Sequence, residues 1–243
     1  MPFTKTLEAL REKCRHVGVL ESPGHGFSDT PGVALTPASW MAAVHLALDM
    51  AIAGPFGPRP VLIGNSLGGA LTIRYALSRP DSLSGVVLCS PAGAPLSEAE
   101  IAEVRRSFRL DTGAQARAFV SRLFARPPWY SALAAPEVRR RMNRPHLRDF
   151  IENVGPEAFL QADELSTLEV PTLVLWGDGD RVLPASGRAF YAASGSACLH
   201  VETAPNIGHC PQIERPQWLA SRVARYIDTL AVRETAEAAS PGP

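Results

Sequence analysis

The chain has 243 residues, of which 46% are hydrophobic and 20% are charged, a composition typical of one globular unit with a sizeable core. Basic and acidic residues number 24 each, so the net charge is zero and nothing in it indicates a nucleic acid or an anionic membrane as partner. The sequence contains no run of 18 apolar residues, so no transmembrane helix is predicted. It also has no apolar segment near Met1, so no signal peptide is predicted.

Helical and strand patterns alternate over the first 90 residues. Thr36 and Pro37 are a favourable helix start, with Thr36 as the N-cap, and this helix is expected to end near Gly54. Alternation of this kind favours an α/β fold with a mostly parallel, doubly wound sheet. The other elements expected here are a helix over 3–13, strands over 16–20, 61–64 and 85–90, and a helix that follows Ser66 and stops before Pro80.

From residue 91 to about residue 166 the pattern changes, and no strand is predicted. Ser97 and Glu100 form a capping box, and Ile101, Val104 and Phe108 follow on one helical face. The segment holds 7 of the 17 aromatic residues and 11 of the 22 arginines. We interpret residues 94–165 as a helical insertion into the α/β unit.

The α/β pattern then resumes. Residues 1–93 and 166–232 are expected to form one core of about five strands, and the polar residues 233–243 are expected to be disordered. The elements predicted in this last part are a strand over 171–176, a helix over 185–193, a strand over 198–202 and a helix over 216–232.

A G-x-S-x-G pattern lies where the strand at 61–64 turns into a helix. Gly64 and Gly68 flank Ser66 at two residues on each side, which favours a tight bend that exposes the serine hydroxyl. The backbone N–H of Leu67 begins the following helix, where it can stabilise an oxyanion. On its own this short pattern is weak evidence for a nucleophile.

Nucleophilic catalysis by a serine also needs a base and a carboxylate that orients the base. Asp180 follows the strand that ends at Trp176, and His209 follows the strand that ends near Glu202. The order Ser66, Asp180, His209 is the one expected on a G-x-S-x-G scaffold. Asp178 is the rival candidate for the acid.

With these residues the chain resembles the α/β-hydrolase family from residue 1 to about residue 232. The resemblance rests on the turn PGHGFSD at 23–29, the acid loop WGDGDRVLP at 176–184 and the histidine loop GHCPQIERP at 208–216. It implies that Asp180 rather than Asp178 is the acid and that residues 94–165 form a cap over the active site. His25 is expected to brace a turn, and Glu214 to hold its own loop.

The chain departs from the family at its start, because it begins in the helix that follows the family's first strands. The resemblance implies that a central strand and a His-Gly loop, which supplies the second oxyanion N–H, are missing. We therefore expect a native chain longer by roughly 40 residues, and weak stability of the 243-residue form. The strands at 16–20 and 61–64 either pair directly or leave a cleft.

The function expected from these residues is that of a serine hydrolase acting on a small-molecule ester that is fairly apolar, with no metal or cofactor. Asn65, Trp129 and Tyr130 are candidate substrate-binding residues, in an acyl pocket that favours uncharged chains. One alternative is a carbon–carbon bond hydrolase of the meta-cleavage-product type, which shares the Gly-Asn-Ser elbow but often has Trp where this chain has Cys210. The other is a non-catalytic binding protein or an inactive fragment.

The four cysteines are scattered along the chain and form no metal-ligand spacing with the histidines. They are typical of reduced thiols, which favours a cytoplasmic protein over a disulfide-bonded secreted one. They are Cys14, Cys89, Cys198 and Cys210.

Overall fold

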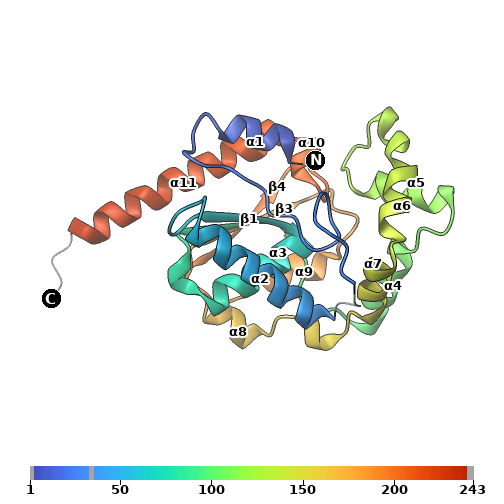
Figure 1. Ribbon diagram of the computed structural model, residues 1–243, viewed down its shortest axis with the longest axis horizontal. Coiled ribbons are helices and arrows are strands. Elements are labelled where there is room, and N and C mark those ends of the chain that lie inside the picture. The colour runs from blue at the N-terminus through green and yellow to red at the C-terminus, as the bar shows by residue number, and fades with distance from the viewer. Residues whose placement is uncertain (1–2, 33–35, 240–243) are drawn as a thin grey trace.

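The computed structural model describes residues 3–32 and 36–239 (Figure 1). Its sheet has four parallel strands in chain order, and they are β1 (Val61–Ser66), β2 (Gly85–Pro91), β3 (Thr172–Gly177) and β4 (Leu199–Ala204). The register pairs Asn65 with Cys89 and Leu175 with Glu202. Since every strand is parallel, all four carboxyl ends meet at one edge, which is where open α/β sheets place their sites.

Helices cover both faces of the sheet (Figure 1). Those around the sheet are α1 (Thr4–Leu10), α2 (Pro37–Ala53), α3 (Leu67–Ser78), η1 (Pro80–Ser82), α9 (Ala185–Ala192), α10 (Pro211–Glu214) and α11 (Pro216–Ala239). Those between β2 and β3, the insertion helices, are α4 (Glu98–Phe108), α5 (Gly113–Arg122), η2 (Trp129–Ala134), α6 (Ala135–Met142), α7 (Pro145–Asn153), η3 (Pro156–Ala158) and α8 (Ala162–Ser166).

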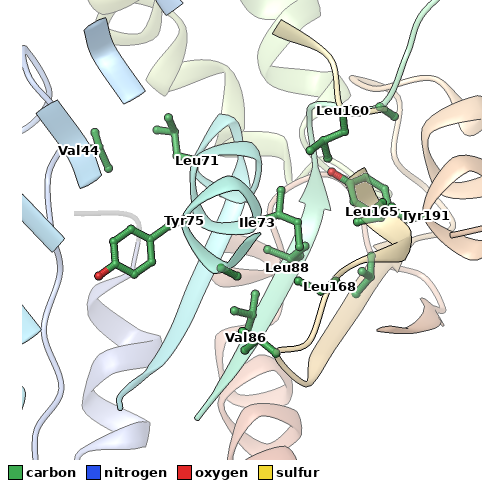
Figure 2. Packing of buried hydrophobic residues seen from close by; sticks show 14 of the residues in the cluster. Val44, Leu71, Ile73, Tyr75, Val86, Leu88, Leu160, Leu165, Leu168 and Tyr191 are labelled. Atoms are coloured by element: carbon green, nitrogen blue, oxygen red, sulfur yellow. The ribbon is translucent and has the colours of Figure 1, made fainter. Parts of the chain in front are cut away.

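The side-chain alternation of the strands divides the core into two layers. Val86 and Leu88 of β2 point to the face covered by α2, α3 and α9, and Figure 2 shows them in one cluster with Ile73 and Tyr75 of α3. Val87, with its neighbours on β3, points to the opposite face, where α1 and α11 pack. Every residue of β2 is buried, and burial on both faces explains its apolar run Val86–Cys89.

Local sequence signals set the helix starts as predicted. Thr36 accepts a hydrogen bond from the Ser39 N–H at the start of α2, and Gly54 follows its last residue. Ser97 and Glu100 make both bonds of the capping box at the start of α4. All the elements between residues 92 and 171 are helical, which confirms that this segment adds no strand to the sheet.

Two expectations are wrong. Residues 16–20 form no strand, because no described strand pairs with them, and only Val17 and Leu20 of this segment are partly buried against the core. The core therefore has four described strands rather than five. Residues 233–239 continue helix α11 instead of being disordered, since this Ala- and Glu-rich stretch consists mostly of good helix formers. Residues 240–243 lie outside the described part.

Among the described residues, no helix is both long enough and apolar enough to cross a membrane.

Candidate active site

Ser66 lies at the bend between β1 and α3, with φ 54° and ψ −121°. A positive φ is unfavourable for a residue with a side chain and costs on the order of 1–3 kcal/mol, so the surrounding packing must hold it. Gly64 allows the bend, because a Cβ there would lie 2.5 Å from the Gly68 carbonyl oxygen. A Cβ at Gly68 would meet nothing within 4 Å, so only the first of the two motif glycines is needed for close approach.

Leu67 is the first residue of α3, so its N–H belongs to the group of helix amides that have no acceptor within the helix. It lies beside Ser66 on the wall of the same cavity. The Ser66 carbonyl oxygen accepts a hydrogen bond of 3.0 Å from the Ala92 N–H, which ties the bend to the end of β2.

Asp180 and His209 come from the loops after β3 and β4 and form a buried pair. The distance from Asp180 Oδ2 to His209 Nδ1 is 2.8 Å, and the two side chains are 1% and 4% exposed. Asp180 Oδ1 accepts hydrogen bonds from the N–H groups of Val182 and Leu183, at 2.8 and 3.2 Å. Burial alone would raise the pKa of Asp180, but His209 and these two amides outweigh it and lower the pKa below its usual value.

This pairing fixes the state of the His209 ring. An ionised carboxylate only accepts hydrogen bonds, so Nδ1 carries a proton, and in the neutral ring Nε2 is then the nitrogen with the free electron pair. No hydrogen bond joins His209 Nε2 to the Ser66 hydroxyl within residues 3–32 and 36–239. Such contacts often tighten only when substrate binds. Asp178 is exposed instead, and its carboxylate accepts from the Asn206 N–H.

Asn65 joins the serine bend to the histidine loop. Its Nδ2 donates hydrogen bonds of 2.9 Å to the carbonyl oxygens of both Cys89 and His209. Its Oδ1 accepts from Gln212 Nε2, also at 2.9 Å. The amide is thus used within the protein, where it joins two loops, and Asn65 is not among the residues that line the cavity beside Ser66.

The end of helix α5 supports the histidine loop from the other side. The His209 N–H donates to the Leu123 carbonyl oxygen at 3.0 Å. The Glu214 carboxylate accepts from the N–H groups of Gly208 and Ala125 at 2.7 and 3.1 Å, which confirms that Glu214 holds its own loop. Arg181, in the acid loop, donates to the Phe124 carbonyl oxygen at 2.9 Å. The acid loop and the histidine loop therefore both form hydrogen bonds to the segment that follows α5.

A cavity of about 270 Å³ lies beside Ser66 and Leu67. Side chains of α4, α7 and η3 supply much of its wall, which is mostly apolar. Among the described lining residues, His25 carries an imidazole and Arg105 carries a charge. The apolar lining from the insertion includes Leu96, Ile101, Val104, Phe108, Met142, Leu147, Phe150, Ile151, Val154 and Phe159.

His25 both braces its turn, as expected, and faces this cavity. Its Nδ1 lies 3.2 Å from the Pro23 carbonyl oxygen, and its ring packs edge-on against Trp40 at 5.5 Å between centroids. Burial lowers the pKa of His25, so the ring is neutral at pH 7. No feature of the sequence indicates that it lies near Ser66.

Trp129 and Tyr130 do not line the cavity. They lie on η2 with 89% and 56% of their surface exposed and contact each other at 5.7 Å between ring centroids. Both side chains therefore lie on the surface of the insertion, away from the cavity beside Ser66.

Sequence reasoning missed Arg105, although a signal was present. Arg105 is four residues after Ile101 and directly after Val104, so it shares their helical face. An arginine within an apolar stripe is unusual and indicates a role on the buried side.

In the described chain, no three His, Cys, Asp or Glu side chains gather closely enough to hold a metal ion. The four cysteines are free, and two of them, Cys89 and Cys210, are buried. Burial raises the pKa of each of these two thiols to about 12, so both are protonated at pH 7.

In a comparison with protein families, residues 4–222 match the alpha/beta hydrolase family. Human monoacylglycerol lipase ABHD6 is 25% identical over 182 residues, which are 68% of this chain and 54% of the lipase. The chain thus spans about half the length of that relative. The pimeloyl-[acyl-carrier protein] methyl ester esterase of Xanthomonas campestris is 26% identical over 229 residues, or 87% of this chain and 84% of the esterase.

Among solved structures, a serine hydrolase from Cycloclasticus zankles matches with a TM-score of 0.75 and 18% identity, covering 93% of this chain and 84% of that one. The 2-hydroxy-6-oxo-6-phenylhexa-2,4-dienoate hydrolase of Rhodococcus matches with a TM-score of 0.71 and 20% identity, covering 84% and 77%. At these identities the likeness concerns the fold alone.

Proposed function

Because this chain belongs to the α/β-hydrolase family, we propose that it is a serine hydrolase that cleaves a small, largely apolar ester through Ser66, His209 and Asp180. The observation that carries this proposal is the strained Ser66 on the wall of an apolar cavity, in a fold that also buries an Asp180–His209 pair. The esterase and the lipase among the relatives support ester cleavage.

In the proposed reaction, Ser66 Oγ attacks the ester carbonyl carbon while His209 Nε2 takes the hydroxyl proton. The resulting oxyanion accepts a hydrogen bond from the Leu67 N–H at the start of α3. As the tetrahedral intermediate collapses, His209 gives its proton to the leaving alcohol and the acyl group stays on Ser66. Water then attacks this acyl-enzyme with His209 as base, which releases the acid and restores the hydroxyl.

Asp180 orients the base in this scheme. Its hydrogen bond to Nδ1 selects the tautomer in which Nε2 can accept the serine proton, and its negative charge stabilises the imidazolium that forms. The lowered pKa of Asp180 keeps its carboxylate ionised at neutral pH.

We further propose that residues 94–165 act as a cap, with residues 1–93 and 166–232 as the core. Support comes from the cavity wall, since α4, α7 and η3 supply many of its apolar side chains while Ser66 and Leu67 come from the core. The elbow residue Asn65 does not favour carbon–carbon bond cleavage, because its amide holds a loop that either reaction needs.

A fluorophosphonate probe tests the proposal, because it reacts with an activated serine and needs no knowledge of the substrate. Wild-type protein should be labelled and should hydrolyse p-nitrophenyl butyrate, and Ser66→Ala should lose both properties. Ser107→Ala is a matched control, since this hydroxyl bonds within α4 to the Val104 carbonyl oxygen and does not line the cavity. Labelling of Ser66→Ala would refute the assignment, and an unlabelled, folded wild type would favour a binding protein.

A further inference from the structure

Arg105 brings a positive charge to the apolar cavity beside Ser66 without a carboxylate to balance it. Its Nη2 donates a 2.8 Å hydrogen bond to the Val154 carbonyl oxygen, which follows the end of α7. Its Nε is buried and has no hydrogen-bond partner among the described residues. Nη2 is thus anchored, whereas Nη1 forms no hydrogen bond within the described part of the chain and keeps its donors for a ligand.

The other arginines on and near α4 differ from Arg105 in this respect. Arg106 pairs with Glu103, and Arg109 lies 3.7 Å from Glu152. Arg122 of α5 reaches Glu103 at 3.9 Å. Within residues 3–32 and 36–239, Arg105 forms no ion pair with any of these carboxylates or with another.

A guanidinium in such a place is costly unless something neutralises it. Burying a charged donor without a partner carries a desolvation penalty that a tie to one carbonyl oxygen only partly offsets. Arginine presents its donors in a planar fork that matches the two oxygens of a carboxylate. Arg105 and Ser66 line one cavity of about 270 Å³, so both face the same space for a ligand.

We propose that the substrate carries a carboxylate at the end remote from the scissile ester, and that Arg105 binds this carboxylate. The inference rests on the proposed ester hydrolysis at Ser66 and names its substrate class. The apolar walls from α4 and α7 contact the chain between the two groups. This departs from the sequence-based expectation of a pocket for uncharged chains.

A length requirement follows from the geometry. The ester carbon must reach Ser66 Oγ while the carboxylate reaches Arg105, so one chain length fits best and shorter or longer chains lose one of the two contacts. Attraction of anionic substrates by the general surface charge would instead raise the rate for every chain length by a similar factor.

The test compares p-nitrophenyl monoesters of straight-chain dicarboxylic acids with the same compounds capped as methyl esters. Wild type should prefer the free acid by roughly 10- to 100-fold in kcat/KM at its best chain length, mostly through KM, as expected for a hydrogen-bonded charge pair. Arg105→Met should abolish this preference, because it should lower kcat/KM for the free acid far more than for the capped ester. Arg106→Met removes an exposed arginine from the same helix and should keep the preference. A mirror series of ω-carboxyalkyl butyrates places the carboxylate on the alcohol side.

Several results would overturn the proposal. These are equal rates on acid and capped ester in both series, a loss in Arg105→Met that is the same for both, or a preference that does not depend on chain length. The proposed hydrolysis fails separately if wild type is not labelled by fluorophosphonate and cleaves neither ester. In that case, calorimetric titration with the monomethyl and dimethyl esters of hexanedioic acid still tests the carboxylate site. The monoester should bind more tightly than the dimethyl ester to wild type, but not to Arg105→Met.

Discussion

Asn65→Ala separates a positioning role for this residue from a substrate-binding role. The substitution removes three hydrogen bonds of 2.9 Å, to the Cys89 carbonyl oxygen, to the His209 carbonyl oxygen and from Gln212 Nε2. It leaves Ser66 and the cavity wall unchanged, because Asn65 does not line the cavity. The change therefore acts on the histidine loop.

The size of the effect follows from these three bonds. Net contributions of 0.5–1.5 kcal/mol each give about 2–4 kcal/mol of lost stability in all. For a chain of this length, that loss lowers the melting temperature by about 5–15 °C. Displacement of the base by a fraction of an ångström to 1 Å should lower kcat by roughly 10- to 100-fold. KM should stay nearly unchanged, since no contact to substrate is lost.

Calorimetric melting and p-nitrophenyl butyrate kinetics on the same preparations measure both effects. Asn153→Ala is a matched control, because that amide bonds only within α7, to the Asp149 carbonyl oxygen. Gln212→Ala should be non-additive with Asn65→Ala, since the two side chains share a hydrogen bond. A raised KM with an unchanged melting temperature would refute this reasoning and restore the substrate-binding interpretation.

Four further outcomes are expected. Asp180→Asn should lower kcat by roughly 10⁴-fold with the fold intact by circular dichroism, whereas Asp178→Asn should not. Because the pKa of Asp180 is lowered below 3.8, its stabilisation is present above that pH and lost as the pH falls through its folded-state pKa, so the melting temperatures of wild type and Asp180→Asn should converge below about pH 4. Gly64→Ala should prevent folding or labelling, whereas Gly68→Ala should be tolerated, which melting curves will show. Trp129→Ala should leave kcat/KM unchanged, because this exposed side chain lies outside the cavity.

Features that depend on neighbouring residues could be predicted from the sequence. The Thr36 cap and the capping box of Ser97 and Glu100 each involve partners three residues apart. The bend at Ser66 likewise follows from residues within two positions of it. Asp180 and His209 lie in separate loops, but each follows a strand, and parallel strands bring their carboxyl ends to one edge.

Features that depend on distant partners could not be predicted. Asn65 bonds to residues 144 and 147 positions away, so its neighbours in the sequence do not reveal its role. The segment 16–20 has the composition of a strand, but a strand also needs a paired neighbour, and no described strand supplies one. Trp129 is aromatic in an aromatic-rich segment, yet burial depends on which helices pack over it.

The central claim is that Ser66 carries the acyl group of the substrate during turnover. The most direct measurement is acid quenching of the wild-type enzyme during hydrolysis of p-nitrophenyl butyrate, followed by mass spectrometry of its peptides. A butyryl group is expected on the peptide that contains Ser66, and none there in Ser66→Ala. A butyryl group on a different residue, or ester consumption by Ser66→Ala at the wild-type rate, would contradict it.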